Sequence, residues 1–219
     1  MLERVLEPEA MDTAEEAASY DAMDHTEANA AFVERLFELG AVGRMLDIGT
    51  GPGHMPPMIC ARDPEATVVG VDLAHHMLER ARANLARTPH AGRIEYRHGD
   101  AKQLDFPDGE FEAVLSNTIL HHVPDPRPFL REALRVLRPG GALLIRDLFR
   151  PATIERLELL VEAHAGDCDA RQRKLFADSL HAAFTPAELR VLANECGLRA
   201  AEIVIDSDRH MSLQIAATS

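Results

Sequence analysis

The chain has 219 residues, of which 46% are hydrophobic and 27% charged, and its formal net charge is −13. This length and composition suit one globular domain, and no apolar run approaches the roughly 18 residues needed to span a bilayer. The negative charge repels polyphosphate and so disfavours nucleic acid, which is not an expected partner.

The first 40 residues are expected to form a helical cap. Residues 1–27 carry nine acids against a single base, Arg4, and therefore hold most of the negative charge. Apolar residues at helical spacing predict one helix over residues 9–39. Gly40 and Gly43 end it, and residues 41–219 are expected to form the main domain.

Short β-type runs alternate with helical stretches after the cap. Because strand and helix alternate, the pattern predicts a parallel sheet with helices on both faces. The predicted strands are residues 44–48, 67–71, 93–97, 111–116 and 142–146, and the predicted helices are 55–62, 75–87 and 126–137.

The C-terminal part has a different pattern. A helical insertion is expected at about residues 152–182, and a further helix runs from Thr185 to Cys196. Residues 198–205 and 210–217 are β-type runs joined by a short link, so they must form an antiparallel hairpin. The expected fold is α/β, a Rossmann-like, mostly parallel sheet of seven strands that ends in this hairpin.

A glycine-rich loop follows the first predicted strand, with Gly49, Gly51 and Gly53 close to Asp47. Glycines let a ligand approach the backbone, and the next helix presents free N–H groups. A nicotinamide dinucleotide would require a third glycine at position 54, which is His54. Asp47 is poorly placed beside a pyrophosphate but suits a ligand with a cationic ammonium.

Two further acids follow neighbouring strands. Asp72 ends the second strand, where a carboxylate can accept hydrogen bonds from ribose hydroxyls. Asp100 follows the third strand, where it could meet an adenine amino group. These acids and the glycine loop stand at the carboxyl ends of successive parallel strands, which is where such folds bind ligands.

Together these segments resemble class I S-adenosylmethionine-dependent methyltransferases, and within them the small-molecule ubiquinone/menaquinone C-methyltransferase type. The resemblance covers about residues 40–150 and includes Leu46–Gly53, Val69–Leu78, Gly99–Asp105, Phe111–Val123 and Leu137–Ile145. It implies S-adenosylmethionine as the cofactor. The glycines would pass under the methionine part, Asp72 would hold the ribose, Met77 and Asp100 with Ala101 would lie at the adenine, and Asn117 near the methionine end. The implied cofactor residues are Asp47, Gly49, Thr50, Gly51, Gly53, Asp72, Leu73, Met77, Asp100, Ala101 and Asn117.

Two adjacent histidines, His121 and His122, follow the fourth strand and are the candidate catalytic residues. An imidazole there could act as a general base near the transferred methyl group. The alternative is that both are structural. The stretch from Ser116 to Ile119 lacks the Asn/Asp-Pro-Pro-aromatic motif of methylases of planar amino groups, which disfavours nucleobase or glutamine N-methylation.

Polar residues at the ends of the fifth and last strands are candidates for binding the acceptor, because these strands are expected to be neighbours. Adjacent residues of a strand point to opposite faces, so Arg146 and Asp147 cannot both face the crevice. One of them is expected to pair with Asp208 or Arg209. Tyr20, in the acidic arm, could point into the same pocket. The candidate substrate residues are Tyr20, Arg146, Asp147, Arg150, Arg209 and His210.

The remaining expectations concern partners and location. Three separated cysteines and the absence of a signal peptide favour the cytoplasm, and no histidine or cysteine spacing predicts a metal site. We expect a small-molecule methyl acceptor, while its reacting atom and the oligomeric state stay open. The alternatives are a non-catalytic module that binds S-adenosylmethionine and, third, an NAD-dependent oxidoreductase.

Overall fold

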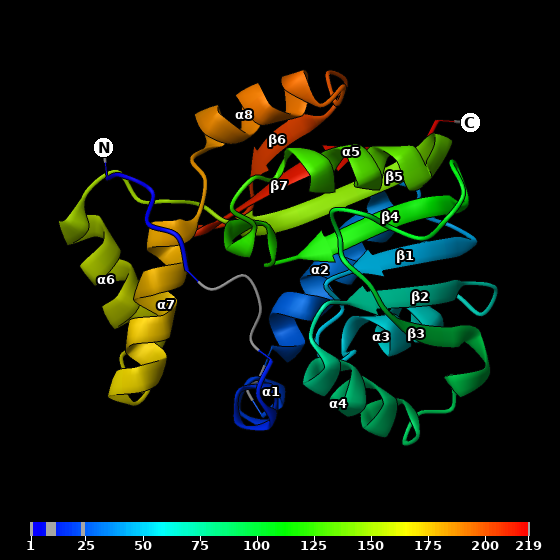
Figure 1. Ribbon diagram of the computed structural model, residues 1–219, viewed down its shortest axis with the longest axis horizontal. Helices are drawn as coiled ribbons and strands as arrows, with labels where there is room; N and C mark the ends of the chain where they lie inside the picture. Colours follow the sequence, from blue (N-terminus) through cyan, green and yellow to red (C-terminus); the bar gives the residue numbers. More distant parts are fainter. Residues whose placement is uncertain (1, 8–11, 23–24, 219) are drawn as a thin grey trace.

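The fold is seen in a computed structural model that describes residues 2–7, 12–22 and 25–218. The described residues form one seven-stranded sheet in the order β3-β2-β1-β4-β5-β7-β6 (Figure 1). This is the expected Rossmann-like arrangement. The strands are β1 (Arg44–Ile48), β2 (Thr67–Asp72), β3 (Ile94–His98), β4 (Phe111–Asn117), β5 (Leu137–Leu148), β6 (Glu202–Ile205) and β7 (His210–Ile215).

The sheet is parallel from β3 to β5 and antiparallel at its last two strands. Strand β7 runs antiparallel to both β5 and β6, which confirms the predicted hairpin. Its register places Arg146 opposite Ser212 and Leu148 opposite His210, so the ends of β5 and β7 are neighbours, as expected. Strand β5 begins earlier than predicted because Leu137 already pairs with Phe111, ahead of a β-bulge.

Helices cover both faces of the sheet (Figure 1). One hydrophobic cluster packs α5 and α8 on one face, and another packs α2, α3 and α4 on the other. The helices of the described residues are α1 (Ala14–Asp21), α2 (Thr26–Glu38), α3 (Met55–Arg62), α4 (His75–Leu85), α5 (Arg127–Val136), α6 (Ile154–Ala165), α7 (Ala170–Ala182) and α8 (Pro186–Glu195), with short 3-10 turns η1 (Ala91–Arg93) and η2 (Leu120–His122).

The central strands are buried on both sides. In β1, Leu46 and Ile48 pack toward α5 while Met45 packs toward α2 and α3. This alternation follows from the two-residue period of a strand. Burial on both faces explains why these strands read as nearly continuous apolar runs in the sequence.

The N-terminal region contains two helices where one was predicted. The Thr13 hydroxyl accepts a hydrogen bond from the Glu16 N–H and so begins α1, and α2 begins separately at Thr26. Residues 8–11 and 23–24, which the predicted helix included, lie outside the described residues. Periodicity alone could not place this division.

The expected insertion at 152–182 consists of α6 and α7, which pack together through the cluster containing Leu157, Leu160 and Leu180. A capping box at Asp169 begins α7 and separates the two helices. Residues 2–7 run beside α7, where the Val5 N–H donates to the His181 carbonyl at 3.3 Å (Figure 1). The division into a cap and a main domain stays a prediction.

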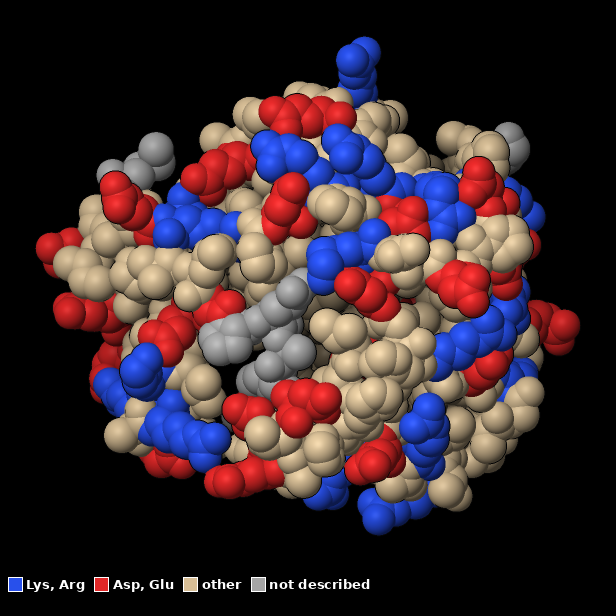
Figure 2. Space-filling view, viewed as in Figure 1, with Lys and Arg blue, Asp and Glu red and all other residues tan. Residues whose placement is uncertain are grey.

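The described residues include no helix long and apolar enough to cross a membrane. Acidic and basic side chains both occur over the face shown in Figure 2, and neither sign covers it alone. That face therefore lacks the single-sign field that steers polyanions to a surface.

Candidate functional site

The glycine loop connects β1 to α3 at the carboxyl edge of the sheet. A Cβ on Gly49 would lie 2.5 Å from Ile119, and one on Gly53 would overlap the Tyr96 hydroxyl. Close packing therefore requires these two glycines. Gly51 differs, because the nearest atom to its Cβ position is a ring carbon of Tyr20 at 4.0 Å. Gly51 is thus the loop position with room beside it.

A cavity of about 160 Å³ lies between the starts of α2 and α3. His54, the residue directly after the loop glycines, contributes to its wall and forms an ion pair with Asp21 at 3.1 Å. The cavity is suited to the polar end of a ligand. Its lining residues are His25, Thr26, Asn29, His54 and Met58.

Asp47, in β1, is fully buried below the loop. Its Oδ2 accepts a hydrogen bond of 2.7 Å from the Thr50 hydroxyl, whereas Oδ1 has no hydrogen-bond partner among the described residues. Burial raises the pKa of Asp47 to about 7, and the negative charge of Asp72 adds to this effect. A buried carboxylate with one free oxygen is suited to a ligand that brings a cation.

Asp72, at the end of β2, is held by backbone donors. The Gly51 N–H donates to its Oδ2 at 2.8 Å and the Ala74 N–H to its Oδ1 at 2.9 Å. Burial raises the pKa of Asp72, although these donors act to lower it. The acid is therefore rigidly placed beside the loop, where each oxygen retains a further lone pair for ligand hydroxyls.

The other predicted cofactor residues lie around this edge. Met77 is buried and belongs to the same apolar cluster as Tyr20. Asp100 forms an ion pair with Lys102 at 3.0 Å; burial acts to raise its pKa, but hydrogen bonds and the charge of Lys102 lower it overall. Leu73 is 37% exposed, and Ala101 packs against the core cluster that includes Leu104.

Tyr20 and the residues after β4 form the next part of the site. Burial raises the pKa of the Tyr20 phenol, partly offset by a hydrogen bond with Thr118. Thr118 has φ +58°, a strained value for a β-branched residue and one that recurs at functional sites. Arg146 donates from Nε to the Asn117 Oδ1 at 3.0 Å and stacks over the Phe32 ring.

His121 and Asp147 form a buried pair in which each side chain is only 3% exposed. The Asp147 Oδ1 lies 2.5 Å from the His121 Nδ1, and its Oδ2 accepts the His121 backbone N–H at 2.7 Å. Burial acts to lower the pKa of His121, but Asp147 and then Glu7 raise it overall. Asp147 thus fixes both the ring and the backbone of His121. The second ring nitrogen, Nε2, lies on the side of the ring away from Asp147.

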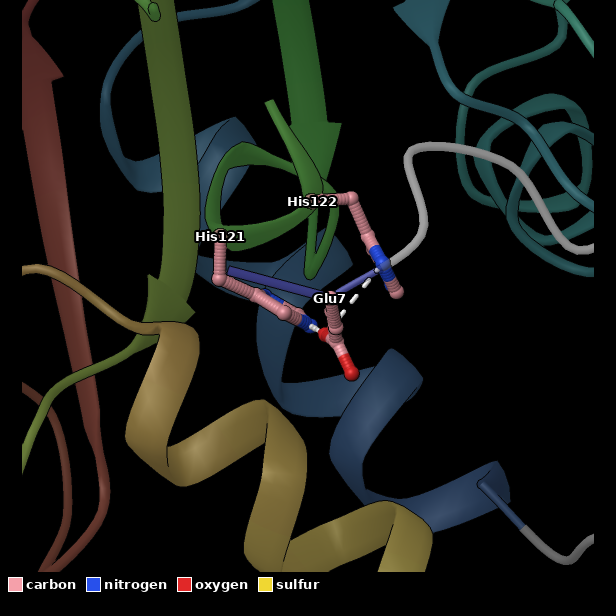
Figure 3. Close-up of side chains that lie close together, drawn as sticks. All are labelled: Glu7, His121 and His122. Carbon is pink, nitrogen blue, oxygen red and sulfur yellow. Dashed lines mark ion pairs between the residues drawn. The ribbon is translucent and has the colours of Figure 1, made fainter. Parts of the chain in front are cut away.

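Glu7 meets both histidines, a contact that sequence reasoning missed (Figure 3). Its Oε1 lies 3.3 Å from the His121 Nε2 and 3.2 Å from the His122 Nδ1. Arg4 anchors the same segment by donating to the His121 and Val123 carbonyls, both at 3.0 Å. The charge count of the acidic arm was the available signal, and it does not single out Glu7.

The remaining substrate candidates are more dispersed. Arg150 is buried and bonds within the protein, to the Leu2 and Ala183 carbonyls and to Glu188. Arg209 contacts Asp208 and His164. The expected pairing of Arg146 or Asp147 with this hairpin end is therefore wrong, because β7 register places Ser212 and Met211 opposite them.

His210 lies near the same end of the sheet as Arg146 and Asp147. Burial lowers the pKa of His210 to about 4, and the positive charges of Arg146 and Arg209 contribute. The structure therefore brings Tyr20, Arg146, Asp147 and His210 into one region, while Arg150 holds the N-terminal segment to α8.

Comparison with known proteins gives consistent matches. A family described as methyltransferase domain matches residues 46–145. The chain is 32% identical to 27-O-demethylrifamycin SV methyltransferase of Amycolatopsis mediterranei, over 78% of this chain and 61% of that protein. It is 36% identical to a ubiquinone/menaquinone biosynthesis C-methyltransferase of Geobacter sulfurreducens, over 50% of this chain and 43% of that protein.

A solved structure from Methanococcus maripaludis, described as a putative S-adenosyl-L-methionine-dependent methyltransferase, has the same fold. It aligns with a TM-score of 0.73 and 21% identity over 98% of both chains. The chain spans 61% or less of the length of the curated relatives it matches first.

Proposed function

Because residues 46–145 match a family described as methyltransferase domain, we propose that the protein transfers a methyl group from S-adenosylmethionine to a hydroxyl of a small molecule. The observation that carries the proposal is the buried His121–Asp147 pair at the carboxyl edge of the sheet. An oxygen acceptor must lose a proton, and this pair can take it. The match to an enzyme named for 27-O-demethylrifamycin supports the choice of oxygen.

The residues at the glycine loop fit S-adenosylmethionine. Asp47 would face the α-ammonium with its unpartnered oxygen, Asp72 would receive the ribose hydroxyls, and Gly51 leaves room for the ligand beside the loop. When bound, this cofactor supplies a methyl group that its sulfonium already activates. The protein's task is then to position the acceptor and to remove its proton.

His121 is the proposed general base. Asp147 accepts the Nδ1 proton, so the lone pair of Nε2, on the side of the ring that faces Glu7, would receive the hydroxyl proton of the acceptor. Asp147 also stabilises the imidazolium that results, as a carboxylate does in other histidine-carboxylate pairs. The Tyr20 phenol is buried, forms a hydrogen bond with Thr118 and is close enough to both Asp72 and Asp147 to be influenced by their charges, so it would help to exclude water from this region.

Labelled methyl transfer tests the proposal. The protein is incubated with methyl-deuterated S-adenosylmethionine and a panel of hydroxylated small molecules, and products are located by mass spectrometry. We expect the label on oxygen in at least one acceptor. His121→Gln should lower the rate by about 10²–10⁴-fold, the usual contribution of a general base. His122→Gln is the matched control, because it changes the adjacent histidine and leaves the His121–Asp147 pair in place.

Other outcomes would contradict the proposal. Label found on carbon or nitrogen alone would refute the oxygen acceptor, and equal rates in the two variants would refute the base. Binding of S-adenosylhomocysteine without transfer to any acceptor would favour the non-catalytic module. Reduction of NAD would be required to revive the oxidoreductase, which the family match does not favour.

Location and partners are part of the same proposal. A cytoplasmic protein agrees with the free cysteines Cys60, Cys168 and Cys196. The net charge of −13 supports a small-molecule acceptor over nucleic acid.

A further inference from the structure

Side chains from two distant parts of the chain converge beside the β4 and β5 ends: Glu7, and the adjacent His121 and His122 (Figure 3). Their ligand-type atoms all lie within 4.8 Å of one another. The Glu7 Oε1 is 3.3 Å from the His121 Nε2 and 3.2 Å from the His122 Nδ1. Two ligand bonds of about 2.1 Å at a tetrahedral angle separate their atoms by about 3.4 Å, which is close to both Glu7–histidine distances.

The buried Glu7 oxygen lacks a hydrogen bond. Its side chain is 9% exposed, and Oε1 has no hydrogen-bond partner among the described residues. Its other oxygen contacts the Ser179 hydroxyl at 3.4 Å. The hydrogen bonds of Arg4, the cation on the same segment, go to the carbonyls of Ala182, His121, Val123 and Pro124. An unsatisfied carboxylate oxygen this deep is costly unless a cation meets it.

A second carboxylate orients the cluster from outside. Asp147 holds the His121 Nδ1 at 2.5 Å, which directs Nε2 toward Glu7. Metal-binding histidines ordinarily donate their other ring N–H to a carboxylate, which fixes the ring and makes the ligand nitrogen more basic. Two buried carboxylates on either side of one imidazole also favour a divalent cation more than a single proton, because one proton leaves a negative charge behind.

We propose that Glu7, His121 and His122 form a binding site for a divalent transition-metal ion, with Zn²⁺ as the best match to two imidazoles and one carboxylate. This donor set suits zinc and the neighbouring metals of its row more than Mg²⁺ or Ca²⁺, which prefer oxygen ligands. The ion would use the same His121 Nε2 lone pair that the proposed base requires. Occupancy therefore inhibits methyl transfer, a consequence that rests on the proposed function, whereas the site itself does not.

Direct metal binding tests the site independently of activity. The chelator-treated protein is dialysed against Zn²⁺, its affinity is measured by competition with a chromogenic chelator, and Co²⁺ absorption reports the ligand set. We expect one ion per chain. Glu7→Gln and His122→Gln should each weaken Zn²⁺ binding by at least about tenfold. Asp147→Asn should weaken it by about 10–100-fold, because Asp147 orients the His121 ring through Nδ1.

His98→Gln is the matched control. It breaks a second close pair of imidazoles, His75 and His98, whose stacked rings are 4.0 Å apart, and it should leave the Zn²⁺ affinity unchanged. Thermal unfolding and S-adenosylhomocysteine binding verify that each variant is folded. The site is refuted if the wild type takes up no Zn²⁺, or if the control variant weakens binding as much as Glu7→Gln does.

Inhibition is measured separately, as the ratio of methyl-transfer rates with and without saturating Zn²⁺. We expect a low ratio in the wild type, reversal by EDTA, and a higher ratio in Glu7→Gln at the same Zn²⁺ concentration. Zn²⁺ binding without inhibition would overturn the link to His121 as a base but support the site. Methyl transfer in a protein that binds no Zn²⁺ would overturn the site and leave the proposed function intact.

Discussion

Replacing Asp47 by asparagine should make the free energy of unfolding less sensitive to rising pH. Asp47 is fully buried, and burial raises its pKa from 3.8 to about 7. The folded state therefore keeps a proton that the unfolded chain releases near pH 4, so the stability falls as the pH rises from 4 through 7. Raising the pKa from 3.8 to about 7 corresponds to about 4 kcal/mol above pH 7, at 1.36 kcal/mol for each pKa unit.

The measurable window lies between pH 5 and pH 8. Across it, the wild type should lose about 2–3 kcal/mol of unfolding free energy relative to Asp47→Asn, because the amide cannot ionise. A constant cost of about 1–3 kcal/mol for a buried amide N–H without a partner affects the variant equally at both pH values and cancels in the difference. Urea unfolding of both proteins at each pH provides the four free energies.

The control is Asp108→Asn, which removes a carboxylate whose side chain is 82% exposed. It should follow the wild type at both pH values. If Asp47→Asn also follows the wild type, then Asp47 ionises without penalty and its assignment as a buried carboxylate with a raised pKa, suited to a cationic ligand, is wrong. Calorimetry adds a second check, since S-adenosylhomocysteine should bind more tightly to the wild type as the pH rises through 7 and lose this dependence in Asp47→Asn.

Three further outcomes test other parts of the structure. Asp147→Asn should lower the methyl-transfer rate by about tenfold or more, because the carboxylate orients the base. The S-adenosylhomocysteine affinity measured by calorimetry should stay near that of the wild type. An unchanged rate would oppose this role. Gly53→Ala should lower the free energy of unfolding in urea by about 2–4 kcal/mol, because the new Cβ would overlap the Tyr96 hydroxyl and the backbone has φ +75°. Gly51→Ala, whose Cβ would lie 4.0 Å from the nearest atom, should lower it by about 1 kcal/mol. Equal losses would contradict the packing described. His210, whose pKa is lowered to about 4, should make the protein lose about 2 kcal/mol as the pH falls from 6.5 toward 4, and His210→Gln should remove this loss in unfolding scans; a matching acid profile in the variant would exclude His210 as the cause.

The sheet could be predicted from local sequence patterns. Apolar runs of strand length, alternating with helical periodicity, predicted the parallel part, and the short link at residues 206–209 required the final hairpin. The glycine loop and Asp72 were equally readable, because the ends of parallel strands share one edge of a sheet. These features depend on residues close in sequence, whose geometry the backbone period determines.

The tertiary structure decided the rest, for a physical reason. The adjacency of His121 and Asp147 was open in the sequence, since it depends on how the turn after β4 packs against the end of β5. Glu7 could not be distinguished from the other acids of the arm until residues 2–7 were placed beside α7. Contacts of this kind join segments far apart along the chain, so they are determined by how the whole fold packs. Sequence periodicity therefore does not predict them.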